Sequence, residues 1–127
     1  MDKKPRNLWN LFPSIRDGPY KIKSMVIYNV TVNINEEIQQ DWLDWMKNVH
    51  IPEVMSTGCF LDSRMMCLSE PQPEEGVTFA IQYRLKDRQT LDRYFDQFAP
   101  ALQQSHTERY LNQFVAFRTI LDLEKEF

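Results

Sequence analysis

The sequence has few of the residues on which common catalytic motifs are built. Only three of its 127 residues are glycine, and no glycine-rich phosphate loop, dinucleotide fingerprint or G-x-S-x-G nucleophile elbow occurs. Its two cysteines, Cys59 and Cys67, are spaced unlike a metal ribbon or a C-x-x-C redox pair, so we expect both to be buried hydrophobic residues. The sequence therefore predicts no bound cofactor.

Long apolar runs and a secretion signal are also missing. No stretch approaches the roughly 20 consecutive apolar residues that a membrane helix needs, and the first residues carry scattered charges where a signal peptide has an apolar segment. Six methionines without a disulfide framework are typical of a reducing compartment. We therefore expect a cytoplasmic protein without a membrane partner.

Positive charge is scarce except at the N-terminus. Residues 1–24 contain six Lys or Arg and two Asp, a net charge of +4, which leaves −7 of the total of −3 on residues 25–127. An acidic body is a poor partner for nucleic-acid phosphates, so we expect no nucleic-acid binding. Prolines and a glycine interrupt the basic segment. We interpret 1–24 as an N-terminal extension, flexible or peripherally docked, and 25–127 as one domain.

From residue 25 onward the hydrophobic pattern switches between the periods of strands and helices. Alternation predicts strands near 25–33, 60–69, 77–85 and 114–123, and a 3.6-residue period predicts helices near 36–50 and 88–104. This βαββαβ order is typical of a ferredoxin-like α+β fold, in which two helices cover one face of a four-stranded antiparallel sheet.

Prolines and capping residues predict where the helices end. Pro52 lacks an amide hydrogen, so we expect the first helix to break near His50, followed by a short turn that stops at Gly58. Ser105 and Glu108 have the spacing of a capping box, which predicts a separate short helix before the last strand.

Three strings of the sequence together resemble a small bacterial family classed as a domain of unknown function. They are MVIYNVTV at 25–32, WLDWMKNVHIPEV at 42–54 and FVAFRT at 114–119. The resemblance spans residues 25–123 and implies a ferredoxin-like fold but no established activity. A looser similarity to dimeric α/β-barrel proteins implies that two sheets pair in a homodimer. Asn112 stands where we expect a glycine helix stop.

The first candidate site is the pair His50 and Glu53. Their three-residue spacing suits an acid–base pair if both face one pocket. The alternative is structural: His50 caps the broken helix and Glu53 occupies the first turn of the next one. A metal site is not expected, because only His106 adds a second imidazole and no carboxylate cluster accompanies it.

The second candidate site is the sheet face opposite the helices. Alternation predicts six polar residues there as ligand-binding groups: Asn29, Thr31, Arg64, Gln82, Arg84 and Arg118. The arginines would hold a small anionic ligand and the others would orient it. The alternative is a face with ordinary salt bridges, for which Asp62 is the candidate partner. Apolar residues mixed into this face favour its burial in a homodimer.

Three functions from different classes remain open. The missing catalytic motifs favour a homodimeric small-molecule-binding or structural domain. The alternative is a cofactor-free oxygenase or isomerase of the dimeric α/β-barrel type, with His50 as the base. An RNA-recognition sheet is the weakest hypothesis, because the aromatic residues of the third strand point toward the helices and its basic-aromatic signature is missing.

Overall fold

A four-stranded antiparallel sheet forms one layer of the domain. The computed structural model describes residues 25–127, so the predicted extension over 1–24 lies outside the described residues. The strands are β1 (Val26–Ile34), β2 (Asp62–Cys67), β3 (Val77–Leu85) and β4 (Phe114–Asp122). Their order is β2-β3-β1-β4, and every neighbouring pair is antiparallel. This is the predicted ferredoxin-like arrangement.

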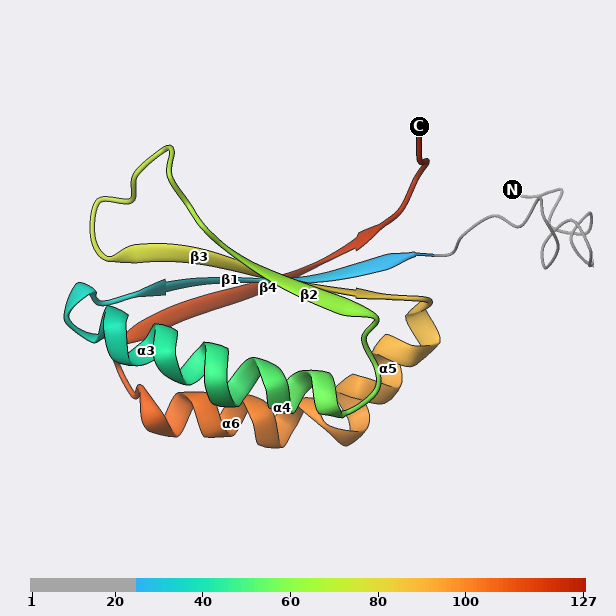
Figure 1. Cartoon of the computed structure of the whole chain (residues 1–127), viewed down its shortest axis with the longest axis horizontal. Coiled ribbons are helices and arrows are strands. Elements are labelled where there is room, and N and C mark those ends of the chain that lie inside the picture. The colour runs from blue at the N-terminus through green and yellow to red at the C-terminus, as the bar shows by residue number, and fades with distance from the viewer. Residues whose placement is uncertain (1–24) are drawn as a thin grey trace, which may run out of the picture.

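Helices cover one face of this sheet. A first helical run connects β1 to β2, and a second connects β3 to β4 (Figure 1). The first run comprises η1 (Glu36–Ile38), α3 (Gln39–Trp45), η2 (Met46–His50) and α4 (Ile51–Ser56). The second comprises α5 (Arg88–Gln97) and α6 (Ala99–Arg109). The predicted α+β class, with its helices on one face, is confirmed. None of these helices is long and apolar enough to cross a membrane.

The predicted break of the first helix at Pro52 is wrong. The backbone continues through it as a π-helical turn, η2, in which the amide of Ile51 donates to the carbonyl of Met46, five residues back. Pro52 then lies in the first turn of α4, where its missing amide hydrogen is tolerated. Gly58 has a φ of 77° and provides the expected left-handed stop.

The predicted separate helix at Ser105 is also wrong. The chain is helical from Ala99 to Arg109 without interruption, and Pro100 lies in the first turn of α6. Ser105 is therefore inside a helix, where the spacing of a capping box has no structural consequence. Sequence spacing alone did not distinguish a helix start from a helix interior.

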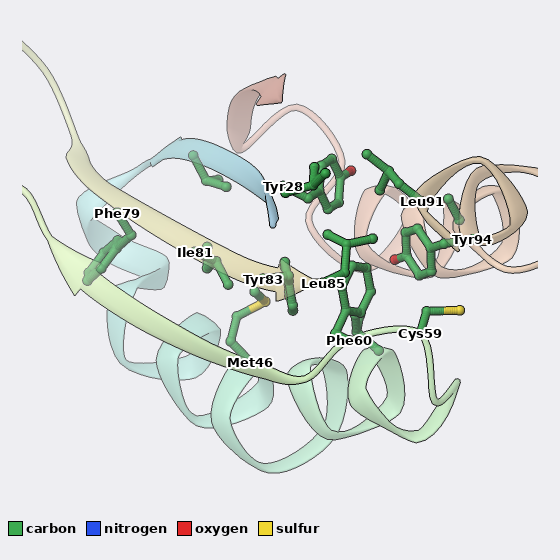
Figure 2. Packing of buried hydrophobic residues seen from close by; sticks show 14 of the residues in the cluster. Tyr28, Met46, Cys59, Phe60, Phe79, Ile81, Tyr83, Leu85, Leu91 and Tyr94 are labelled. Atoms are coloured by element: carbon green, nitrogen blue, oxygen red, sulfur yellow. The ribbon is translucent and has the colours of Figure 1, made fainter. Parts of the chain in front are cut away.

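An aromatic core fills the space between the sheet and the helices. Tyr28 of β1 lies beside Tyr83 of β3 and Tyr94 of α5, with ring centroids 6.0 Å apart in both pairs. Phe60 packs its ring 4.7 Å from Tyr94 (Figure 2). Trp42 is completely buried and contacts Phe79. Full burial of an apolar side chain of this size contributes about 1.5–3 kcal/mol, so this core positions the helices on the sheet.

The predicted orientation of β4 is reversed. Arg118 pairs with Val30, and Phe117 pairs with Thr31, so Arg118 lies on the helix side of the sheet and Phe117 on the open side. Val115 and Leu121, 70% and 48% exposed, share the open side with Phe117, which is 62% exposed. Because both faces of β4 carry apolar residues, hydrophobic alternation does not determine which face meets the core.

The two cysteines differ in environment. Cys59 is buried, as expected. Cys67 is exposed, so the expectation that both cysteines are buried was wrong for this residue. It ends β2, the edge strand of the sheet beyond β3, and an edge strand has a neighbour on one side only.

Asn112 takes the role that a glycine helix stop usually has. Its φ is 64°, a left-handed conformation that side chains other than Asn and Asp adopt with difficulty. We expect Asn112→Ala to lower the free energy of unfolding by about 1 kcal/mol and Asn112→Gly to leave it nearly unchanged. Urea unfolding of the two variants measures this, and equal losses in both would show that the Asn112 side chain, and not its backbone conformation, matters.

Candidate functional site

A small cavity lies between the helices and the sheet, with a volume of about 40 Å³. Its walls are largely apolar and include Val30, Val32, Met46 and Ile81. Polar side chains converge on it from both layers of the fold: Tyr28, His50, Tyr83, Tyr94, Gln103, His106 and Arg118. An apolar chamber with a few convergent polar groups is the usual form of a small-molecule site.

The π-helical turn η2 places His50 in this cavity. In an α-helix, residues five apart lie about 140° apart around the axis. The wider turn brings them closer, and the rings of Trp45 and His50 stack with centroids 4.9 Å apart and an interplanar angle of 24°. Arg109 in turn lies over Trp45, with its guanidinium carbon 5.4 Å from the ring centroid. His50 is therefore held by its neighbours and is 9% exposed.

The Nδ1 atom of His50 is buried and has no hydrogen-bond partner among the described residues. Burial, together with the smaller effect of the positive charge of Arg118, lowers the pKa of His50 to about 4. The imidazole is therefore neutral at pH 7. A buried polar atom without a partner costs about 1–3 kcal/mol, so this atom is a candidate contact for a bound molecule.

His106 of α6 lies next to His50, with ring centroids 5.8 Å apart. The indole Nε1–H of Trp42 donates to Nε2 of His106 over 2.9 Å. Burial lowers the pKa of His106 to about 4, with smaller contributions from His50 and Arg118. Because Nε2 accepts a hydrogen bond, the single proton of neutral His106 is on Nδ1. Trp42 therefore fixes the tautomer of a second neutral histidine.

Arg118 brings a positive charge to the cavity from β4. It lies on the edge strand and is exposed, so its guanidinium also reaches solvent. Burial raises the pKa of the Tyr28 hydroxyl, while the charge of Arg118 and side-chain hydrogen bonds with Arg118 and Gln103 oppose the rise. Burial also raises the pKa of Tyr83 and of Tyr94. The three tyrosines are therefore neutral at pH 7.

The predicted His50–Glu53 pair does not form. Glu53 is exposed on α4 and does not line the cavity, whereas His50 is buried. The structural alternative is only half right, since His50 precedes α4 but makes no capping hydrogen bond, while Glu53 does occupy its first turn. Within residues 25–127, no group of three or more His, Cys, Asp or Glu side chains is arranged to hold a metal ion.

The predicted polar site is divided between the two faces of the sheet. Arg84 and Arg64 lie on the open face, and both bond to Asp62, with Nε of Arg84 3.1 Å from each carboxylate oxygen. Asn29 bonds Thr31 and Thr119, and Gln82 pairs with Asn29 in the ladder. Only Arg118 is on the other side. The ordinary salt-bridge alternative therefore describes Arg64 and Arg84, whose partner Asp62 was expected.

Hydrogen bonding to Arg84 holds the pKa of the Asp62 carboxyl below its usual range, and the smaller effect of burial opposes this. The side chains of Arg84 and Asp62 are 35% and 39% exposed. Exposed pairs of this kind contribute about 0–1 kcal/mol. Asp62 therefore joins the start of β2 to β3 and is the acidic partner of both Arg64 and Arg84.

The sequence hypotheses missed Gln103 and Tyr28 and gave His106 only a metal role. The sequence did contain a signal for Gln103 and His106. They are three residues apart and therefore lie on one side of a helix. That side faces the cavity only because α6 is continuous. The reversed orientation of β4 concealed that Arg118 completes the same cluster.

The fold defines the class of protein: a ferredoxin-like α+β domain with a cavity between its helices and its sheet. The sequence profile of the domain of unknown function DUF4286 matches residues 25–124. The chain belongs to this family. The search of curated proteins gives no match.

Solved structures of the same fold have diverse functions. A hydroxynitrile lyase from Passiflora edulis has 12% identity and a TM-score of 0.62, over 84% of this chain and 99% of that one. SnoaB from Streptomyces nogalater, a cofactor-independent oxygenase, has 7% identity and a TM-score of 0.58, over 81% and 96%. A dimeric ferredoxin-like protein from an uncultured marine organism has 17% identity and a TM-score of 0.52, over 84% and 100%. At these identities the similarity shows the fold alone.

The two neutral histidines predict a specific dependence of stability on pH. An unfolded histidine has a pKa near 6.5, whereas His50 and His106 have values of about 4 in the folded state. Between these values the unfolded chain binds more protons, so the free energy of unfolding falls as the pH is lowered from about 6.5 to about 4. Each histidine contributes up to about 1.4 kcal/mol per pH unit.

Urea unfolding between pH 7 and pH 4.5 measures this slope. His50→Gln removes one titrating group and should reduce the slope by about half of the histidine contribution. The depressed pKa values of Asp62 and Asp87 affect only the acid side of this window. Equal slopes in the wild type and the variant would mean that His50 titrates normally in the folded protein.

Proposed function

We propose that the chain binds a small organic molecule in the His50 cavity and transfers a proton to or from it, as a cofactor-free isomerase or oxygenase would. The observation that carries the proposal is the buried Nδ1 atom of His50, which has no partner among the described residues. A neutral imidazole in an apolar chamber is available as a proton acceptor at pH 7.

The chemistry common to both reaction classes is the removal of a proton from carbon next to a carbonyl group. His50 would accept this proton and leave an enolate in the cavity. When the carbon that loses the proton also bears a hydroxyl group, the anion is an enediolate, and return of the proton to the former carbonyl carbon, with a proton shift between the two oxygens, gives an isomer. The largely apolar walls limit the access of bulk water to the anion. His106, with its Nδ1–H, is a second group of the cavity wall that can donate a hydrogen bond to a carbonyl oxygen.

The comparisons support this proposal at the level of the fold only. Two proteins with the same architecture are described as a hydroxynitrile lyase and a cofactor-independent oxygenase. Both names are compatible with a small-molecule chamber on this scaffold. Fold alone does not determine function, so the geometry around His50 carries the argument.

Exchange of carbon-bound hydrogen tests the proposed base directly. Hydroxyacetone, a small neutral carbonyl compound, is incubated with the protein in D₂O at neutral pH, and deuterium incorporation is followed by NMR. The wild type should accelerate incorporation over buffer, and His50→Gln should reduce the acceleration by about 10²-fold, the usual contribution of a general base.

Glu53→Gln is the matched control, because Glu53 is exposed on the same helical run and lies outside the cavity. It should exchange hydroxyacetone like the wild type. Equal activity of His50→Gln and the wild type, or no acceleration by either, would contradict the proposal.

We further propose that the open face of the sheet pairs with a second copy of the chain. The face carries the exposed apolar side chains of Val115, Phe117, Leu121 and Met66. Exposed apolar residues gathered on one face of a sheet often mark an association surface. The dimeric ferredoxin-like protein of the same fold supports a homodimer as the assembly.

A charge placed in this face should prevent pairing. Phe117→Lys would bury one ammonium group per subunit at the interface, at a cost of several kcal/mol, and should give a monomer in light scattering at micromolar concentration. Leu111→Lys is the control, because Leu111 is 60% exposed and lies in the turn before β4, outside the face. A monomeric wild type, or a dimeric Phe117→Lys variant, would contradict the assembly.

A further inference from the structure

The charges around the cavity are unbalanced. No Asp or Glu is among the described residues that line it, whereas Arg118 is. The ion pairs among residues 25–127 join Asp41, Asp62 and Asp92 to other arginines, and none includes Arg118. The cation at the cavity therefore has no carboxylate partner within 4.0 Å in the part of the chain that the structure describes.

The other polar groups of the cavity are neutral and can donate hydrogen bonds. Nδ1 of His106 carries a proton because Nε2 accepts from Trp42. Tyr28 keeps its proton and interacts with both Arg118 and Gln103. A cation that lies beside neutral donors, without a carboxylate within 4.0 Å among the described residues, complements a negatively charged group.

We propose that the ligand of this cavity is a small carboxylate, held by Arg118 at the sheet edge, whose binding draws one proton from solvent onto His50. This inference rests on the proposed function, since it names the class of molecule that the His50 site accepts. The carboxylate supplies the negative charge that Arg118 lacks, and protonated His50 donates to it through the Nδ1 atom that is otherwise without a partner. His50 then has the charge that it would have after accepting a proton from carbon, so the acid occupies the place of the enolate and is not itself deprotonated by His50.

The size of the cavity limits the bound group. A void needs about 10–15 Å³ by the same measure to hold one water molecule, so about 40 Å³ accepts only a few heavy atoms. Formate and acetate are of this size. A longer acid would place its carboxylate near Arg118 and extend past the exposed edge of β4.

The groups that face His50 explain why binding of an anion is coupled to uptake of a proton. Tyr28, Tyr83 and Tyr94 face it from β1, β3 and α5, His106 from α6, and Arg118 from β4. The tyrosines have raised pKa values and stay neutral below pH 8. Among these described groups around the cavity, only the two histidines can therefore gain a proton between pH 4 and pH 8. A bound anion favours the charged imidazolium and raises the pKa of His50.

Calorimetric titration of the full chain tests the charge requirement. Acetate and acetamide have nearly the same shape and differ in charge, so acetate should bind at least about tenfold more tightly. Titrations at pH 6 in two buffers of different ionisation enthalpy give the number of protons taken up, which should be above zero for acetate. Equal affinities for the two compounds, or no acetate binding, would overturn the proposal.

Variants locate the site. Arg118→Met should weaken acetate binding about tenfold or more, while His50→Gln should abolish the proton uptake. Arg88→Met is the matched control, because Arg88 is an exposed arginine of α5 paired with Asp92 and lies outside the cavity. It should bind acetate like the wild type, and a loss equal to that of Arg118→Met would overturn the proposal.

The two proposals fail in different ways. If hydroxyacetone is exchanged through His50 but acetate does not bind, the base is correct and the carboxylate preference is wrong. If acetate binds with proton uptake but hydroxyacetone is not exchanged, the anion site stands and proton transfer from carbon is wrong. If Arg118→Met binds acetate as tightly as the wild type does, the assignment of the anion to this cavity is contradicted, whatever the wild-type affinity is.

Discussion

The hydrogen bond from the Ile51 amide to the Met46 carbonyl is the interaction on which the site depends. Pro52 has no amide hydrogen to offer to the carbonyl four residues earlier, and the helix meets this loss by widening one turn instead of breaking. The wider turn stacks His50 on Trp45 and directs its ring toward α6 and the sheet. Single π-helical turns frequently occur at functional sites.

The pairing of β1 with β4 is the second constraint. Because side chains alternate along a strand, a shift by one residue would exchange Arg118 with Phe117 and place an aromatic ring in the cavity and a cation on the open face. The observed register gives the cavity its charge and gives the open face its exposed apolar residues. Both proposed properties, anion binding inside and association outside, therefore follow from one register.

Much of the fold was predictable from the sequence, because the patterns of β1 and β3 agree with their burial. Both strands alternate cleanly, and Asp87 caps α5 by accepting a hydrogen bond from the amide of Thr90. The predictions failed where two local signals conflicted. Pro52 indicated a helix end, while the surrounding apolar pattern continued, and only the packed structure shows how the backbone reconciles the two.

The candidate site was predictable only in part. His50 was identified from its position beside a helix irregularity. Glu53, the partner predicted from the three-residue spacing, is exposed to solvent. The groups around His50 come from five separated elements, so no local spacing could reveal them. Arg118 illustrates the limit best: its strand is apolar on both faces, and only long-range pairing with Val30 determines where its guanidinium lies.

His50 is a buried, neutral imidazole that faces a ligand chamber. A pH titration of the ¹⁵N-labelled histidine ring signals by NMR tests it most directly, with His50→Gln used to assign the signals. We expect His50 in the folded protein to titrate far below the usual 6.5, with a pKa of about 4, and acetate to raise this pKa. A His50 signal that titrates near 6.5 and does not respond to acetate would contradict it.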